Sequence, residues 1–80
     1  MKIGEATLLR VQELCDEKGI TINGLANRAG ITRSVMGNWI SRGVAEPSLS
    51  TVKKICDGLD IGIIEFFTCD LFRNLEQEIE

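Results

Sequence analysis

The chain has 80 residues and a formal net charge of −3, and 44% of its residues are apolar. That apolar content is typical of a folded domain and argues against disorder. No apolar run approaches the roughly 18 residues of a membrane span, and the N-terminal stretch lacks the basic and apolar regions of a signal peptide. We therefore expect one small cytoplasmic domain. Dimerisation would add burial, since so short a chain buries only about 60% of its unfolded surface.

The residue types argue against most catalytic and metal chemistry. The chain has no histidine and no tyrosine, and its three cysteines form no Cys-x-x-Cys pair. A zinc site needs clustered cysteine or histidine ligands, and the sequence also lacks a glycine-rich phosphate loop and a nucleophile elbow. We expect no metal, no cofactor and no enzymatic activity. We interpret the thiols of Cys15, Cys56 and Cys69 as small buried hydrophobes, with redox sensing as the alternative.

The acidic total conceals a basic middle. Residues 1–20 carry a net charge of −1, residues 21–54 carry +4, and residues 55–80 carry −6. Charges are felt over about 10 Å at 0.1 M salt, so a phosphate ligand responds to the local charge more than to the total. The middle segment suits nucleic acid, provided that the acidic C-terminal third faces away from it. A solvated surface with chance asymmetry is the alternative interpretation.

Apolar residues recur at helical spacing along the chain, and no alternating run is long enough to predict a strand. The sequence therefore predicts an all-α domain of five helices, at residues 5–18, 22–28, 33–40 and 48–58, with the fifth beginning near residue 62. The apolar stripes of these helices are the predicted core: Leu8, Val11, Leu14, Cys15, Leu25, Ala26, Val35, Met36, Trp39, Ile40, Leu49, Val52, Ile55, Cys56, Ile63, Phe66 and Phe67.

Local turn chemistry marks the ends of the first three helices. Gly19 and Gly30 follow the first two helices, where glycine readily takes the positive φ that ends a helix. Thr21 and Thr32 precede the second and third helices, where a hydroxyl accepts from the free N–H groups of the first turn. Two short helices joined by a glycine-containing turn form a helix-turn-helix unit.

In such a unit the second helix enters the major groove of DNA with its N-terminal residues toward the base edges. The corresponding helix here has a polar outer face formed by Arg33, Ser34, Gly37, Asn38 and Ser41. Arginine can bridge guanine O6 and N7, asparagine can pair with adenine, and serine is adaptable. A polar outer face on a generic helical core is the alternative interpretation.

Two stretches carry a family resemblance: GITINGLANRAGITRSVMGNWI at 19–40 and PSLSTVKKICDGLDIGIIEFF at 47–67. Together they resemble the Cro/repressor-type, or Xre, helix-turn-helix family. The shared features are a capping threonine, Leu-Ala, a glycine and hydrophobe before the recognition helix, and Pro-Ser-Leu at the fourth helix. The resemblance covers Leu8 to Phe67. It implies a five-helix, lambda-repressor-like domain, usually dimeric, that binds operator DNA as a transcriptional regulator.

The resemblance also implies residue roles. Base contacts are expected from Thr32, Arg33, Ser34 and Asn38, and phosphate contacts from Thr21, Asn23, Ser41 and Arg42. Trp39 is interpreted as a core residue. The expected division is a DNA-binding domain at 1–68 and an acidic extension at 69–80. A seam of Phe72, Leu75 and Ile79 favours a short, dimer-forming helix in that extension.

The chain departs from the family pattern at several positions. Cys15 and Ile40 stand where the family often has an arginine–glutamate ion pair. Replacing both charges together with apolar groups can leave stability unchanged. We therefore predict that the two side chains touch. Ile22 replaces a phosphate-binding glutamine, and Arg42 occupies a position that is commonly glycine, which weakens the expected contacts there. Gly37 is either a tolerated weak spot or a point of close approach to the groove.

The sequence thus predicts a small repressor that binds double-stranded DNA as a homodimer on a short palindromic operator and obstructs polymerase. A protein-interaction module is the alternative, for example the antitoxin of a toxin–antitoxin pair, with the acidic residues 65–80 binding a basic partner. A generic helical domain without DNA affinity is the third hypothesis.

Overall fold

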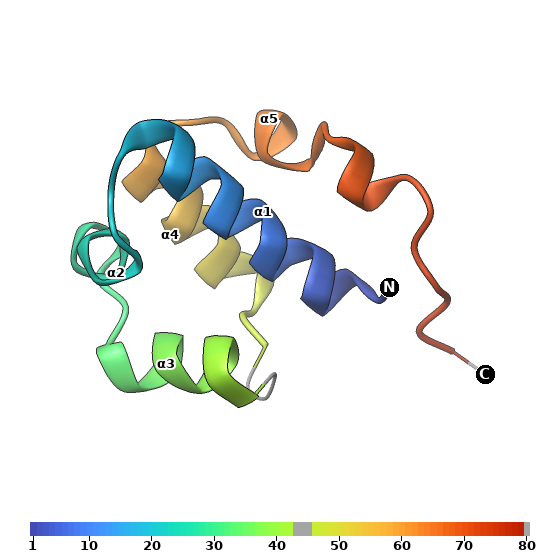
Figure 1. The fold of residues 1–80 in the computed structure, drawn as a ribbon, viewed down its shortest axis with the longest axis horizontal. Coiled ribbons are helices and arrows are strands. Elements are labelled where there is room, and N and C mark those ends of the chain that lie inside the picture. Colours follow the sequence, from blue (N-terminus) through green and yellow to red (C-terminus); the bar gives the residue numbers. More distant parts are fainter. Residues whose placement is uncertain (43–45, 80) are drawn as a thin grey trace.

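The computed structural model describes residues 1–42 and 46–79, without the side chain of Arg42. Its described part is all-helical, with α1 (Ile3–Lys18), α2 (Ile22–Ala29), α3 (Arg33–Arg42), α4 (Leu49–Leu59), α5 (Ile63–Phe67) and a 3₁₀ turn, η1 (Asp70–Phe72). The molecule measures 36 × 25 × 20 Å. In Figure 1, α1 crosses the centre, α3 lies on one side of it, and α5 lies on the other. None of the described helices is long and apolar enough to cross a membrane.

The predicted helix ends are confirmed where local chemistry set them. Gly19 and Gly30 take φ values of 66° and 71° and end α1 and α2. The Thr21 hydroxyl accepts from the backbone N–H of Gly24 at 2.9 Å and begins α2. The fourth helix differs slightly, because Asp60, with φ of 58°, ends it in place of Gly58. These caps fix the lengths of the helices and the sharp turn between α2 and α3.

One core holds the helices together. Val11, Leu25, Ile55 and Phe66 are completely buried in it, and they come from four different helices. Cys15 is 3% exposed and belongs to this core, whereas Ile40 is half-buried and packs against it. Direct contact between Cys15 and Ile40 stays a prediction.

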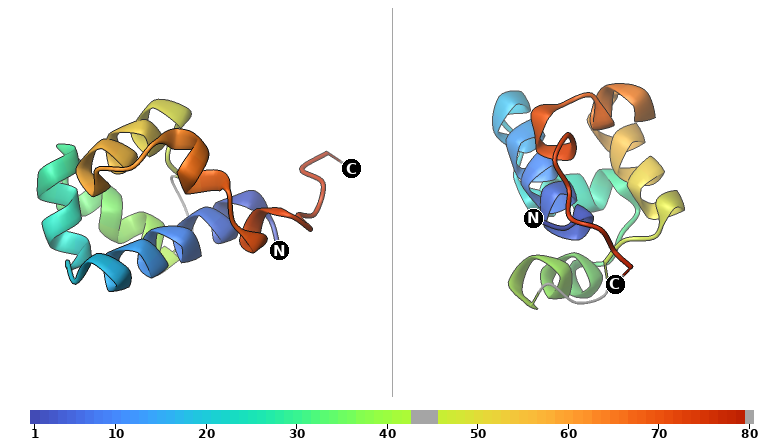
Figure 2. Two further views of the ribbon diagram at one scale, coloured as in Figure 1. Left: turned by 90° about the horizontal axis from the view of Figure 1, so that it is seen from above. Right: turned by 90° about the vertical axis from the view of Figure 1, so that its right-hand side faces the viewer.

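Gly58 brings α2 and α4 close together. A Cβ built there would lie 3.1 Å from Cδ1 of Leu25 and 3.3 Å from the backbone nitrogen of Ala29. The missing side chain thus allows the C-terminal end of α2 to rest against α4. This contact seats the α2–turn–α3 unit on the rest of the domain (Figure 2).

Two predicted core positions are wrong. Leu49 is 75% exposed and Val35 is 46% exposed. Both lie at the edges of their apolar stripes: Leu49 is the first residue of α4, and Val35 lies in the first turn of α3. Among residues 1–42 and 46–79, no neighbouring element covers either position enough to bury it, so spacing alone overestimated the width of the buried face.

The C-terminal extension contains less helix than its apolar seam predicted. One 3₁₀ turn forms at Asp70–Phe72, and residues 73–79 contain no helix. The ring of Phe72 packs against that of Phe67, with centroids 4.9 Å apart, and both rings lie near Phe66. Ile79 is 80% exposed. Aromatic packing on α5 therefore fixes the start of the extension. Further along, the Glu76 carboxylate pairs with the N-terminal ammonium at 3.0 Å, and its backbone N–H donates to the carbonyl oxygen of Met1 at 3.0 Å.

Candidate nucleic-acid interface

The α2–turn–α3 unit is built from two capped helices. The Thr21 hydroxyl begins α2, and the Thr32 hydroxyl accepts from the backbone N–H of Val35 at 3.3 Å at the start of α3. A Cβ on Gly24 would lie 3.2 Å from the Thr21 hydroxyl, so glycine leaves room for the first cap. Both helix N-termini are consequently well defined, and each directs its remaining free N–H groups outward.

Buried side chains determine which face of α3 points outward. Met36 and Trp39 are each 3% exposed, which confirms the interpretation of Trp39 as core. Successive residues of a helix are about 100° apart, so the face opposite these two carries Ser34, Asn38 and Ser41. All three are exposed, and so is Arg33 at the start of the helix. The structure thus brings together three expected base-contacting residues on one short helix.

The other predicted site residues lie close by in the chain. Thr32 is exposed, but its hydroxyl is engaged as the cap of α3. Thr21 and Asn23 are exposed at the start of α2, and Ser41 is exposed near the end of α3. The side chain of Arg42 lies outside the described residues. Ile22, which replaces the expected phosphate-binding glutamine, packs against the core.

Val35 is the surface residue that sequence reasoning missed. Its 46% exposure adds an apolar side chain to an outward face otherwise made of polar groups. The helical repeat places it next to Asn38, one turn further along α3. The signal was present in the sequence, because Val35 lies at the edge of the stripe defined by Met36 and Trp39.

The acidic α5 and η1 lie away from α3, whereas Glu76 further along the extension lines one hollow together with Trp39 of α3. The turn η1 packs along α1, and Figure 1 shows α5 and η1 on the opposite side of α1 from α3. Residues 73–79 continue beyond the N-terminal end of α1 and not toward the start of α3 (Figures 1 and 2). The condition that the acidic third face away from nucleic acid agrees with the position of α5 and η1, and Glu76 is the acidic residue that lies nearer to α3.

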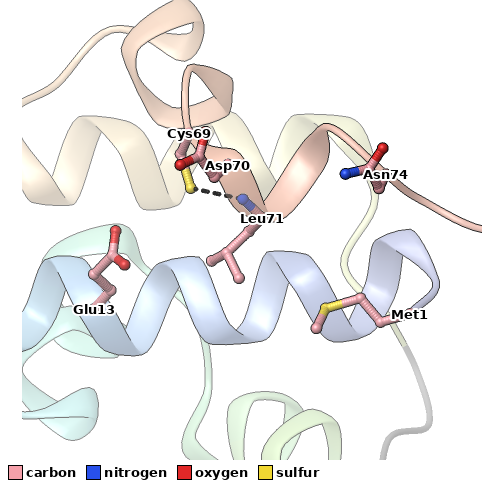
Figure 3. A pocket seen from close by; sticks show the side chains of 6 residues that line it. All are labelled: Met1, Glu13, Cys69, Asp70, Leu71 and Asn74. Carbon is pink, nitrogen blue, oxygen red and sulfur yellow. Dashed lines mark hydrogen bonds between the residues drawn. The ribbon is translucent and has the colours of Figure 1, made fainter.

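A hollow of about 600 Å³ lies beneath η1. Figure 3 shows it between α1 and the extension, with Met1 and Glu13 on the α1 side and Cys69 and Asn74 on the side of the extension. The sulfur of Cys69 accepts from the backbone N–H of Leu71 at 3.4 Å. In residues 1–42 and 46–79, no three histidine, cysteine, aspartate or glutamate side chains gather as a metal site requires.

The other two thiols are inert by burial. All three cysteines are free, and Cys15 and Cys56 are buried. Loss of solvation on burial raises the pKa of both thiols above the ordinary value of 9.0. A neutral thiol is a poor nucleophile, so these two side chains act as small apolar groups in the core.

Comparisons with known proteins agree with this geometry. Residues 10–70 match the family described as the Cro/C1-type HTH DNA-binding domain. None of the curated proteins compared with the chain matches it. Among solved structures, the chain is similar to the crystal structure of the prophage Lp1 protein 11, with 30% identity and a TM-score of 0.80. That similarity covers 94% of this chain and 100% of the other. The chain belongs to the Cro/C1-type helix-turn-helix DNA-binding family.

Proposed function

We propose that the chain is a transcriptional repressor that binds a short palindromic operator as a homodimer and obstructs polymerase. The observation that carries the proposal is the outward face of α3. Its polar side chains are exposed, while Met36 and Trp39 anchor the helix in the core. A rigid helix with exposed polar residues at its N-terminal end suits the major groove.

Three exposed side chains on α3, those of Arg33, Ser34 and Asn38, can pair with base edges. Arg33 can donate two hydrogen bonds to O6 and N7 of guanine, and Asn38 can bond N6 and N7 of adenine. Ser34 lies between them in sequence and can donate or accept. We propose that Thr21 and Asn23 at the start of α2, together with Ser41, contact phosphates, and that free helix N–H groups add to the attraction. All three residues are exposed.

An exposed apolar surface on α4 and α5 supports the homodimer. Leu49 is 75% exposed and Ile64 is 78% exposed. Leu49 shares the lining of a hollow of about 140 Å³ with Phe67, and Ile64 precedes Phe67 by one helical turn. We call Leu49, Ile64 and Phe67 the α4–α5 apolar surface. A second copy of the chain that covered this surface would supply burial that an 80-residue core lacks.

Selection from a randomised duplex library, followed by affinity measurement against salt, tests the proposal. We expect an enriched palindrome whose half-sites are about one helical turn, roughly 34 Å, apart. The affinity for that sequence should fall steeply with salt, because bound cations are released from the phosphates that the protein neutralises. Absence of both enrichment and salt-dependent binding would contradict DNA binding. The exposed acidic residues of the extension would then be the first place to seek a basic protein partner.

One substitution, measured on two duplexes, separates base contacts from phosphate contacts. Arg33→Ala should relax the preference at one position per half-site and cost about 1–3 kcal/mol on the selected operator. It should cost much less on random DNA. Equal losses on both duplexes would show that Arg33 contacts only phosphate.

A further inference from the structure

Val35 is the one feature of α3 that the polar contacts leave unexplained. It is 46% exposed, and the helical repeat of about 100° per residue sets it at the edge of the outward face, between Asn38 and the buried Trp39. A single exposed valine elsewhere on a protein needs no explanation. On this face, however, the side chain would enter the major groove together with its polar neighbours and would meet the base edges.

The major groove offers one apolar group to such a side chain, the C5-methyl of thymine. Polar residues gain little from that methyl group. Valine presents two methyl groups of its own, and its β-branched side chain holds one strongly preferred rotamer in a helix. Little side-chain entropy is therefore lost when Val35 is fixed against a base.

We propose that Val35 is a specificity-determining residue that packs against the C5-methyl group of a thymine neighbouring the base contacted by Asn38. The proposal rests on the proposed function, because it requires α3 to lie in the major groove. It adds a hydrophobic base contact to the hydrogen-bonding base contacts proposed for Arg33 and Asn38. The operator should accordingly contain, in each half-site, a thymine whose methyl group contributes to affinity.

The test uses the operator selected with the unmodified chain. Each thymine of the operator is replaced symmetrically by uracil, which removes the methyl group and keeps the base pair. Dissociation constants are measured at one salt concentration. At one symmetric position the replacement should weaken binding by about fourfold for each half-site, or roughly 15-fold for both, which corresponds to one buried methyl group per half-site.

The same duplexes are then bound by Val35→Ala, Asn38→Ala and Ile79→Ala. With Val35→Ala the penalty for uracil should fall below about twofold, because the methyl group has lost its partner. With Asn38→Ala the penalty should persist on a weaker baseline. Ile79 is an exposed aliphatic residue outside α3, so Ile79→Ala should keep both the affinity and the full penalty. Circular dichroism should show all three variants folded, since each replaced side chain is exposed.

The outcomes separate this inference from the proposed function. No enriched sequence would overturn both. An enriched operator with no thymine beside the position sensitive to Asn38 would overturn only the role of Val35. A uracil penalty that stays unchanged in Val35→Ala would do the same, because another group would then be contacting the methyl.

Discussion

Arg10 holds α5 against α1 through its guanidinium group. The residue is 9% exposed, and its Nε donates to the carbonyl oxygen of Phe66 at 2.7 Å while Nη2 donates to that of Glu65 at 2.9 Å. Both carbonyls belong to the last turn of α5, where the helix dipole also favours a cation. Its ion pair with Glu13 involves a carboxylate side chain that is 46% exposed.

Replacing Arg10 with methionine should therefore destabilise the domain strongly. A hydrogen bond to a charged group contributes about 1.5–3 kcal/mol, so two such bonds set an upper range of roughly 3–6 kcal/mol. Methionine restores much of the apolar burial, and water can reach the partly buried carbonyl of Glu65, so we expect about 3 kcal/mol. Domains of this size unfold with about 0.05–0.15 kcal/mol per residue, so the loss is a large share of the total.

Urea unfolding at one protein concentration, followed by circular dichroism, measures the effect. With a slope near 1 kcal/mol per molar urea, the midpoint should fall by about 3 M. Arg10→Lys should lie between wild type and Arg10→Met, because a lysine ammonium does not reproduce the two-pronged contact. Glu13→Gln is the matched control and should cost less than about 1 kcal/mol, as exposed ion pairs do. Equal losses from Glu13→Gln and Arg10→Met would refute the reasoning, since the ion pair and not the carbonyls would then carry the stability.

Three further predictions follow from packing and charge. Gly37 has open space where a Cβ would be, so Gly37→Ala should raise the free energy of unfolding by about 0.5–1 kcal/mol and leave operator affinity unchanged. Gly58→Ala is the control and should lower the free energy of unfolding, because its Cβ would meet α2. Lost affinity in Gly37→Ala would indicate close approach to the groove. Burial raises the pKa of the Cys15 and Cys56 thiols. Their contribution to stability is therefore complete below the unfolded pKa of 9.0 and is lost as pH rises through the folded pKa values. The urea midpoint should decrease from pH 8 to pH 10, and an unchanged midpoint would contradict this prediction. Ile64→Glu should make the protein monomeric in sedimentation equilibrium, with Ile79→Glu as the control; a persistent dimer would place the interface elsewhere.

The features predicted well from sequence are those that depend on neighbours in the chain. A threonine three residues before a free N–H, or a glycine at the end of an apolar stripe, determines a helix end by local geometry. That is why Thr21, Gly30 and Thr32 behave in the structure as expected. The polar face of α3 follows from the same local repeat, so the exposed positions of Arg33 and Asn38 could also be predicted.

The features that were missed depend on distant parts of the chain. Arg10 contacts carbonyls 55 and 56 residues away, and no local pattern distinguishes it from a surface arginine. Val35 and Leu49 lie at the edges of their stripes, where burial depends on which element lies above. A helix was predicted in the extension from its apolar seam, yet an isolated helix shorter than about 12–15 residues is only marginally stable. The glutamates at the end of the chain also oppose the dipole of such a helix.

The distribution of charge reconciles an acidic chain with a proposed nucleic-acid partner. The segment from 55 to 80 carries a net charge of −6, but α5 and η1 lie across α1 from α3. At 0.1 M salt, charges further apart than about 10 Å are largely screened. A phosphate at the α3 face would thus be influenced mainly by the basic middle segment. Lowering the salt lengthens the screening distance, so the acidic side would then begin to oppose binding and the affinity should rise less steeply than the phosphate contacts alone require.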